Sequence, residues 1–243
     1  MDYGEFFERF GGSARTKHLG SSQNPEKPVV HLPEISGLPK EFIRLCPWEM
    51  EFLYAVARRA QVGILEIGRF NGGSTFLLSC ANPAVPIHSI DRAPQNDELL
   101  KELFHKHDVG RNVSLIVGDS QKTKYDSIRR IDLLFVDGDH SYEGCSADIR
   151  NWYDTLVPGG MMVFHDSYTA PLYGVQDAVL DFLHERNGEV QVVVSPLIGA
   201  SHWRYPHGSM ACLQRRPQAG PWQGGGLAER ARTSIAGLFR RRH

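Results

Sequence analysis

Residues 131–167 read IDLLFVDGDHSYEGCSADIRNWYDTLVPGGMMVFHDS, and this stretch carries the clearest indication of the fold class. Two hydrophobic runs of strand length, 131–136 and 161–164, are separated by a helical pattern and a Pro-Gly-Gly turn, so we expect them to be parallel neighbours in one sheet. Parallel strands bring their carboxyl ends to the same edge, where open α/β sheets bind ligands. Each run ends in residues suited to a hard divalent cation and a nearby base: Asp137, Asp139 and His140 after the first, His165 and Asp166 after the second.

The alternation of strand and helix patterns continues on both sides of this stretch. Helices between the first five strands predict a doubly wound parallel sheet. The last two strands have only a turn-rich linker between them, which predicts an antiparallel pair at one edge. The fold class is therefore α/β, with a mostly parallel seven-stranded sheet. Strands are predicted at 63–67, 86–90, 113–117, 131–136, 161–164, 190–194 and 209–213, and helices at 74–80, 97–107, 122–129, 143–156 and 171–185, after a helix opened by Pro47.

Acidic residues also mark the ends of the first three strands. The first strand runs into EIGRFNGGS (66–74), whose glycines let the chain turn sharply beside a ligand. This loop lacks both the GxGxxG dinucleotide fingerprint and the P-loop lysine. Asp91 ends the second strand, where an acid can bond ribose hydroxyls, and Asp119-Ser120 ends the third, where it can meet a base edge. Because these acids would repel phosphate, they favour a nucleoside cofactor without phosphates over NAD or ATP.

Together these motifs resemble those of class I S-adenosylmethionine-dependent methyltransferases. They are most similar to the small metal-dependent O-methyltransferases that act on sugars of polysaccharides, macrolides and aminocoumarins. EIGRFNGGST resembles the first motif of the family, SIDRAP the second and VGDS the third, while VDGDHSYEGCSADIRNW and LVPGGMMVFHDS resemble its most specific signature. The resemblance covers residues 47–215 and implies a Rossmann-like methyltransferase fold with S-adenosylmethionine as the cofactor.

The resemblance also implies a role for each matching residue. A magnesium ion is expected at Asp137, His165 and Asp166. Many relatives carry two adjacent acids at this last position, and the imidazole of His165 in place of the first acid makes manganese an alternative. Asp91 is expected on the ribose hydroxyls, and Asp119 with Ser120 on the adenine. The full set of expected cofactor contacts is Glu66, Gly68, Asn71, Ser74, Asp91, Asp119, Ser120 and Asp137.

A sugar hydroxyl is a poor nucleophile at neutral pH, so methyl transfer to it needs a base. His140, three residues beyond Asp137, is the expected base because an unperturbed histidine titrates near neutrality. Asp139 is the alternative. The predicted function is cation-dependent O-methylation of a hydroxyl on a sugar in a glycan, polysaccharide, glycolipid or glycosylated natural product. A phenol or catechol acceptor and a non-catalytic nucleoside-binding scaffold are the two alternatives. Asp148 and Trp152 are interpreted as packing and surface residues.

Composition and charge also bear on binding partners and cellular location. A formal net charge of -1 gives no case for nucleic-acid binding. Four scattered cysteines, an N-terminus unlike a signal peptide and the lack of a long apolar stretch indicate a cytoplasmic protein. We expect an N-terminal lid or oligomerisation segment (1–46), a methyltransferase domain (47–215), a basic flexible or amphipathic tail (216–243) and a homo-oligomer, most simply a dimer. Residues 215–243 hold seven arginines against one glutamate, so the tail could make weak contact with an anionic membrane surface.

Overall fold

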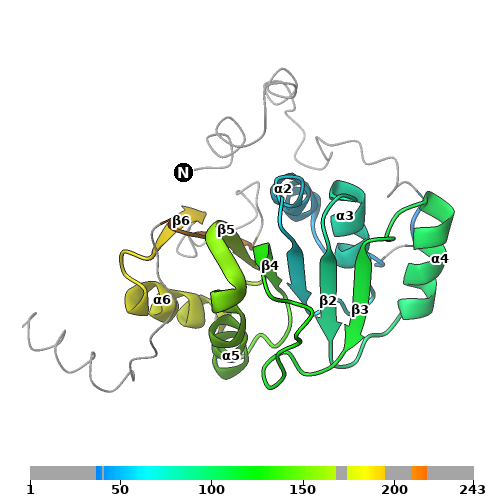
Figure 1. Ribbon diagram of the computed structural model, residues 1–243. Coiled ribbons are helices and arrows are strands. Elements are labelled where there is room, and N and C mark those ends of the chain that lie inside the picture. The colour runs from blue at the N-terminus through cyan, green and yellow to red at the C-terminus, as the bar shows by residue number, and fades with distance from the viewer. Residues whose placement is uncertain (1–36, 40, 168–173, 195–208, 218–243) are drawn as a thin grey trace, which may run out of the picture.

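The computed structural model describes residues 37–39, 41–167, 174–194 and 209–217, and Figure 1 shows a twisted sheet with helices on both faces. The predicted tail beyond residue 217 and most of the predicted N-terminal segment lie outside these residues. In chain order the described elements are α2 (Pro47–Ala57), β1 (Ile64–Ile67), α3 (Gly73–Ala81), β2 (Ile87–Asp91), α4 (Asp97–His107), β3 (Val113–Val117), β4 (Ile131–Val136), α5 (Tyr142–Trp152), the 3-10 helix η2 (Tyr153–Thr155), β5 (Leu156–Phe164), α6 (Val175–Glu185), β6 (Val190–Val194) and β7 (Ala211–Arg215).

The seven strands form one sheet in the order β3-β2-β1-β4-β5-β7-β6. Neighbours among the first five strands pair in parallel, whereas β7 runs antiparallel to both β5 and β6. The predicted α/β fold and the antiparallel pair are therefore confirmed. The last strand in the chain lies inside the sheet, between β5 and the edge strand β6.

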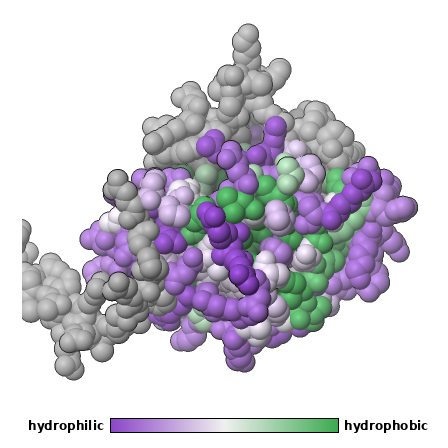
Figure 2. All heavy atoms as spheres, in the orientation of Figure 1, coloured by the Kyte–Doolittle hydropathy of each residue, from purple (hydrophilic) through white to green (hydrophobic). Residues whose placement is uncertain are grey.

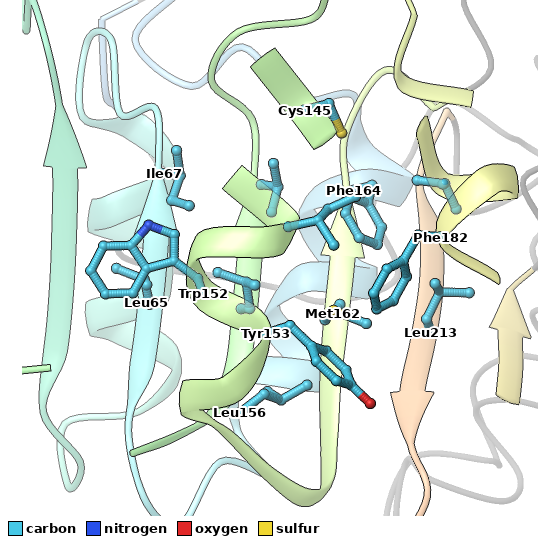
Figure 3. Close-up of a cluster of buried hydrophobic side chains, with 14 of the residues drawn as sticks. Leu65, Ile67, Cys145, Trp152, Tyr153, Leu156, Met162, Phe164, Phe182 and Leu213 are labelled. Carbon is cyan, nitrogen blue, oxygen red and sulfur yellow. The ribbon is translucent and has the colours of Figure 1, made fainter. Parts of the chain in front are cut away.

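Helices cover both faces of the central strands. On one face Phe52 of α2 and Leu77 of α3 belong to the same buried cluster as Phe135 of β4. On the other face Trp152 of α5 and Phe182 of α6 belong to a second cluster, which Figure 3 shows against the sheet. Because both faces are covered, β1 is buried at every position, as is typical of a central parallel strand.

The predicted helix at 122–129 is wrong, because turns connect β3 to β4. Contacts with α5 explain the difference: the side chain of Asn151 donates to the carbonyl of Ser120 at 2.6 Å, and Tyr125 stacks on Trp152 with ring centroids 6.4 Å apart. The segment therefore crosses the end of α5 instead of coiling. It leaves Val117 66% exposed, and Figure 2 shows apolar atoms at the surface in the region of β2 to β4.

Two further boundaries differ from expectation. The Pro-Gly-Gly segment, predicted as a turn, is part of β5, where the pairing with β4 shifts between Ile131 and Leu133. Gly159 in this segment has φ +87°, which lets the irregular strand bend without strain. The described part of the last predicted helix begins at Val175, and residues 168–173 lie outside the described residues. Among the described helices, none is long and apolar enough to cross a membrane.

Candidate active site

A cavity of about 800 Å³ opens at the carboxyl edge of the sheet. The loops after β1 to β5 line it, together with Phe42, Arg44 and Leu45 from the segment before α2. Its size suits a small organic ligand. Every predicted site residue lines this cavity except Glu66, which is fully buried behind it. The sheet topology therefore brings the sequence-predicted groups into one site.

The loop after β1 forms the floor of the cavity. Gly68 has φ +85°, and a Cβ there would overlap the carbonyl of Asp137, so only glycine lets the ends of β1 and β4 approach this closely. Asp91 accepts hydrogen bonds from the backbone N–H groups of Arg69 and Phe70, each at 2.8 Å, and from that of Ala93 at 2.7 Å. The carboxylate predicted to bind ribose thus also fixes the loop around it.

Arg69 holds this loop to the rest of the sheet, a role that the sequence analysis missed. Its buried guanidinium pairs with Asp97 through Nε and Nη2 at 2.8 and 2.7 Å. It also donates to the carbonyls of Ser89 and Ile116, both at 2.9 Å. One side chain therefore connects the loop after β1 to β2, β3 and the first turn of α4. An arginine after the glycine, with an acid opening the predicted helix at 97–107, was the available signal.

Glu66 supports the same loop from behind. Its Oε2 accepts hydrogen bonds from Thr75 Oγ1 and Ser89 Oγ, both at 2.5 Å. Burial raises the pKa of Glu66 to about 7, although hydrogen bonds from serine and threonine hydroxyls act in the opposite direction. This predicted cofactor contact is buried beneath the loop that would hold the methionine portion of the cofactor.

The loop after β3 supplies the predicted adenine end. Asp119 accepts a hydrogen bond from the backbone of Gln121 at 3.0 Å and pairs with Lys122 at 3.1 Å. The hydrogen bond with Lys122 lowers the pKa of Asp119. Ser120 donates its hydroxyl to Asp148 at 2.7 Å, so Asp148, interpreted from the sequence as a packing or surface residue, is buried and bonded to a residue of the site.

Charged side chains converge where β4 and β5 end. His140 Nε2 lies 3.2 Å from Asp137 Oδ1, and His140 Nδ1 lies 3.7 Å from Asp166 Oδ2. His165 Nδ1 lies 3.0 Å from the same Asp137 oxygen and 3.5 Å from Asp166 Oδ2. Asp166 has a positive φ of 50°, a strained conformation for this residue that is often found at functional sites.

Glu49 completes this cluster from α2, and the sequence analysis did not single it out. Its Oε2 lies 3.2 Å from His165 Nε2, while Oε1 accepts a hydrogen bond from the backbone of Ser209 at 2.9 Å. Burial acts to raise the pKa of Glu49, but the hydrogen bond and charge of His165 lower it to about 2. Burial acts to lower the pKa of His165, but the charge of Asp137 raises it overall. His165 therefore lies between two carboxylates, that of Asp137 on one side and that of Glu49 on the other.

The donor set fits a divalent cation. Asp137, His140 and Asp166 each offer a ligand atom, and these atoms lie within 4.8 Å of one another. The predicted third ligand, His165, also directs Nδ1 at Asp137, while its other nitrogen faces Glu49. A carboxylate behind the second imidazole nitrogen is the usual support for a metal-binding histidine. Two carboxylates with one or two imidazoles suit manganese as well as magnesium.

This sheet order, with the last strand antiparallel next to the edge and a ligand cavity at the carboxyl ends of the parallel strands, defines the class I methyltransferase fold. Residues 65–167, which span the predicted motifs, match the family model described as Methyltransferase domain (Methyltransf_24). The predicted resemblance of these residues to class I S-adenosylmethionine-dependent methyltransferases is thereby confirmed.

One curated protein is similar to part of the chain. "Uncharacterized protein R132" of Acanthamoeba polyphaga mimivirus is 32% identical over 114 residues, which are 42% of this chain and 50% of that protein. The chain thus spans half the length of this curated relative.

Solved structures share the fold at low identity. The SAH-bound Podospora anserina methyltransferase PaMTH1 has a TM-score of 0.55 at 16% identity, over 75% of this chain and 84% of that one. The SAM complex of the O-methyltransferase TomG from Streptomyces achromogenes, involved in tomaymycin synthesis, has a TM-score of 0.54 at 20% identity, over 73% of this chain and 83% of that one. The O-methyltransferase NovP has a TM-score of 0.57 at 15% identity, over 70% of this chain and 81% of that one.

Proposed function

We propose that this protein is an S-adenosylmethionine-dependent O-methyltransferase that acts on a sugar hydroxyl with the help of a divalent cation. The observation that carries the proposal is the position of His140, within 3.2 Å of Asp137 at the same cavity that Asp91 and Ser120 line. One end of the cavity thus has groups for a nucleoside and the other has a base beside carboxylates. Solved O-methyltransferases with the same fold support this reading.

The cofactor fits along the loops after β1, β2 and β3. Asp91 has a carboxylate fixed by backbone N–H groups, so it can accept from ribose hydroxyls without reorganising. Gly68 and Asn71 border the part of the cavity where the methionine portion would lie, and Asp119 with Ser120 borders the part for adenine. The sulfonium methyl would then point toward the carboxyl ends of β4 and β5.

Asp137 and Asp166 would hold the cation with His165 as the imidazole ligand, which leaves His140 for the role of base. Bound there, a divalent cation supplies polarisation and orientation of the acceptor hydroxyl. The acceptor oxygen forms a bond to the methyl carbon as the carbon–sulfur bond breaks, which yields the methyl ether and S-adenosylhomocysteine. The hydroxyl proton must leave in the same step, and His140 is the base best placed to accept it.

His140 is a better base than Asp139 in this structure. The hydrogen bond with Asp137 raises the pKa of His140, although burial opposes this. Asp139 accepts hydrogen bonds from the backbone of Ser141 at 3.0 Å and from Gln121 at 3.2 Å, and the Ser141 bond lowers the pKa of Asp139. A carboxylate stabilised in this way accepts a proton less readily.

The test combines calorimetric titration with turnover. Wild-type protein should bind S-adenosylmethionine, and its turnover with sugar acceptors should be lost in EDTA and restored by magnesium or manganese. Asp137→Asn should retain the fold but lose nearly all turnover. In His140→Ala the rise in rate on the acidic side of the pH profile should flatten, because the neutral imidazole is the active form.

Each alternative outcome identifies a different function. Turnover with catechols but not with sugars would show that the acceptor is a phenol and not a sugar. Cofactor binding with no turnover on either would indicate a nucleoside-binding scaffold. Turnover that persists in EDTA would agree with the proposed methyltransferase activity but exclude the proposed role of the cation. The dimer, the cytoplasmic location and a membrane contact of the basic tail stay predictions, which sedimentation, fractionation and vesicle binding can test.

A further inference from the structure

Ser120 is held by α5 through three contacts, although it lies on the loop after β3. Its hydroxyl donates to Asp148 Oδ1 at 2.7 Å. Its carbonyl accepts from Trp152 Nε1 at 3.0 Å and from the side chain of Asn151 at 2.6 Å. Asp148 is only 1% exposed, whereas Ser120 lines the cavity. The buried helix therefore fixes both the position of Ser120 and the direction of its hydroxyl proton.

The direction of that proton determines what Ser120 can offer to a ligand. A hydroxyl has one proton to donate and two lone pairs to accept with. Burial raises the pKa of Asp148 to about 6, so at pH 8 its carboxylate is ionised and only accepts. The proton of Ser120 is then committed to Asp148, and only the lone pairs of Ser120 are available to the cavity. The neighbouring carboxylate of Asp119 is likewise an acceptor. Ser120 and Asp119 therefore both present acceptors to a base that binds beside them.

We infer that Asp148 is a specificity-determining residue: by fixing the hydroxyl of Ser120 as an acceptor, it makes the site select a purine with a 6-amino group over one with a 6-oxo group. The inference rests on the proposed function, in which an adenosyl cofactor occupies the cavity. The amino group of adenine donates to Ser120. The 6-oxo group of hypoxanthine would face the same lone pairs, and one acceptor would be left without a donor. Asp148 acts through Ser120 and does not itself line the cavity.

A purely structural role for Asp148 makes a different prediction. Loss of a structural contact would weaken both purines alike, since the loop would hold either base less well. Loss of the hydroxyl's fixed direction would change the ratio of the two affinities. Asn151→Ala is the matched control, because it removes an anchor of the Ser120 carbonyl and leaves the hydroxyl donating to Asp148.

The experiment measures the dissociation constants of S-adenosylhomocysteine and S-inosylhomocysteine by calorimetry at pH 8. Wild-type protein should prefer the adenosyl compound by roughly 10- to 100-fold, the effect of leaving one acceptor unpaired. In Asp148→Asn the amide can donate to Ser120 and free its proton for the ligand, so the ratio should fall at least fivefold. Asn151→Ala should weaken both ligands and keep the wild-type ratio.

Ser120→Ala keeps the test decisive if Asp148→Asn does not fold. It removes the hydroxyl and should lower the ratio as much as the Asp148 change does. In the Ser120→Ala background, Asp148→Asn should cause no further change in the ratio. Wild-type ratios in the folded variants would overturn the inference, as would a wild-type protein that binds both compounds equally. Absence of S-adenosylhomocysteine binding in the wild type would instead refute the proposed cofactor, a distinguishable result.

Discussion

Glu66 makes the stability of this protein depend on pH in an unusual direction. Its carboxyl group is fully buried, and burial raises its pKa from 4.5 to about 7. Below pH 4.5 the group is protonated in both the folded and the unfolded chain. Between pH 4.5 and 7 the folded chain keeps the proton that the unfolded chain releases. This contribution to stability is therefore complete at low pH and is lost as the pH rises through about 7.

The magnitude follows from the size of the shift. Each pH unit between the two pKa values changes the free energy of unfolding by about 1.36 kcal/mol, so the whole window amounts to about 3 kcal/mol. Glu66→Gln carries a neutral side chain at every pH and can still accept from Thr75 and Ser89. We expect the variant to equal the wild type near pH 4.5 and to be more stable by about 3 kcal/mol at pH 8.

Urea unfolding followed by circular dichroism at pH 5, 6, 7 and 8 measures this difference directly. Other groups titrate in the same range, but subtracting the wild-type curve from that of the variant removes their contribution. Glu102→Gln is the matched control, because Glu102 is exposed on α4 and its difference from wild type should not change with pH. A difference between Glu66→Gln and wild type that stays constant from pH 5 to 8 would refute the reasoning.

Two further predictions concern residues that the sequence analysis missed. Arg69→Met should lower the free energy of unfolding, measured in urea, by about 3 kcal/mol, because it leaves Asp97 without its buried partner. The matched change Arg111→Met removes a salt bridge with Asp108 whose side chains are 82% and 78% exposed, and it should change the free energy of unfolding by no more than about 0.5 kcal/mol. Equal effects of the two changes would contradict the argument. Glu49→Gln should weaken manganese binding in calorimetry by about 10- to 100-fold with little effect on S-adenosylmethionine binding, because it removes the charge behind His165; unchanged metal affinity would exclude that support.

Much of the fold could be predicted because several of its strands, at the edges as well as in the centre of the sheet, are distinct in the sequence. The strands at 113–117, 131–136 and 190–194 have the predicted bounds, since each is a short apolar run between turn residues. The predicted helix at 122–129 failed because its conformation depends on contacts with Asn151 and Trp152 across space. Local propensity does not contain such information.

The residues of the candidate site also differ in whether the sequence alone could predict them. Residues at strand ends could be predicted, because the topology of a parallel sheet brings strand ends together whatever lies between them. Glu49 and Asp148 could not, because each sits on a helix and reaches the site only through the way that helix packs. Their sequence neighbours suggest only a helix start and a surface face. Groups that support a site from helices thus require the packed structure.

The placement of β7 has a consequence for how the chain folds during synthesis. The carboxyl-terminal strand of the sheet pairs with β5 on one side and β6 on the other, so β6 has no strand to join until residues 211–215 emerge from the ribosome. The contact between Glu49 and Ser209, just before β7, also joins an early helix to this late segment. Sheet completion is therefore coupled to the end of domain synthesis, which disfavours a functional site on the nascent chain before the whole domain is released.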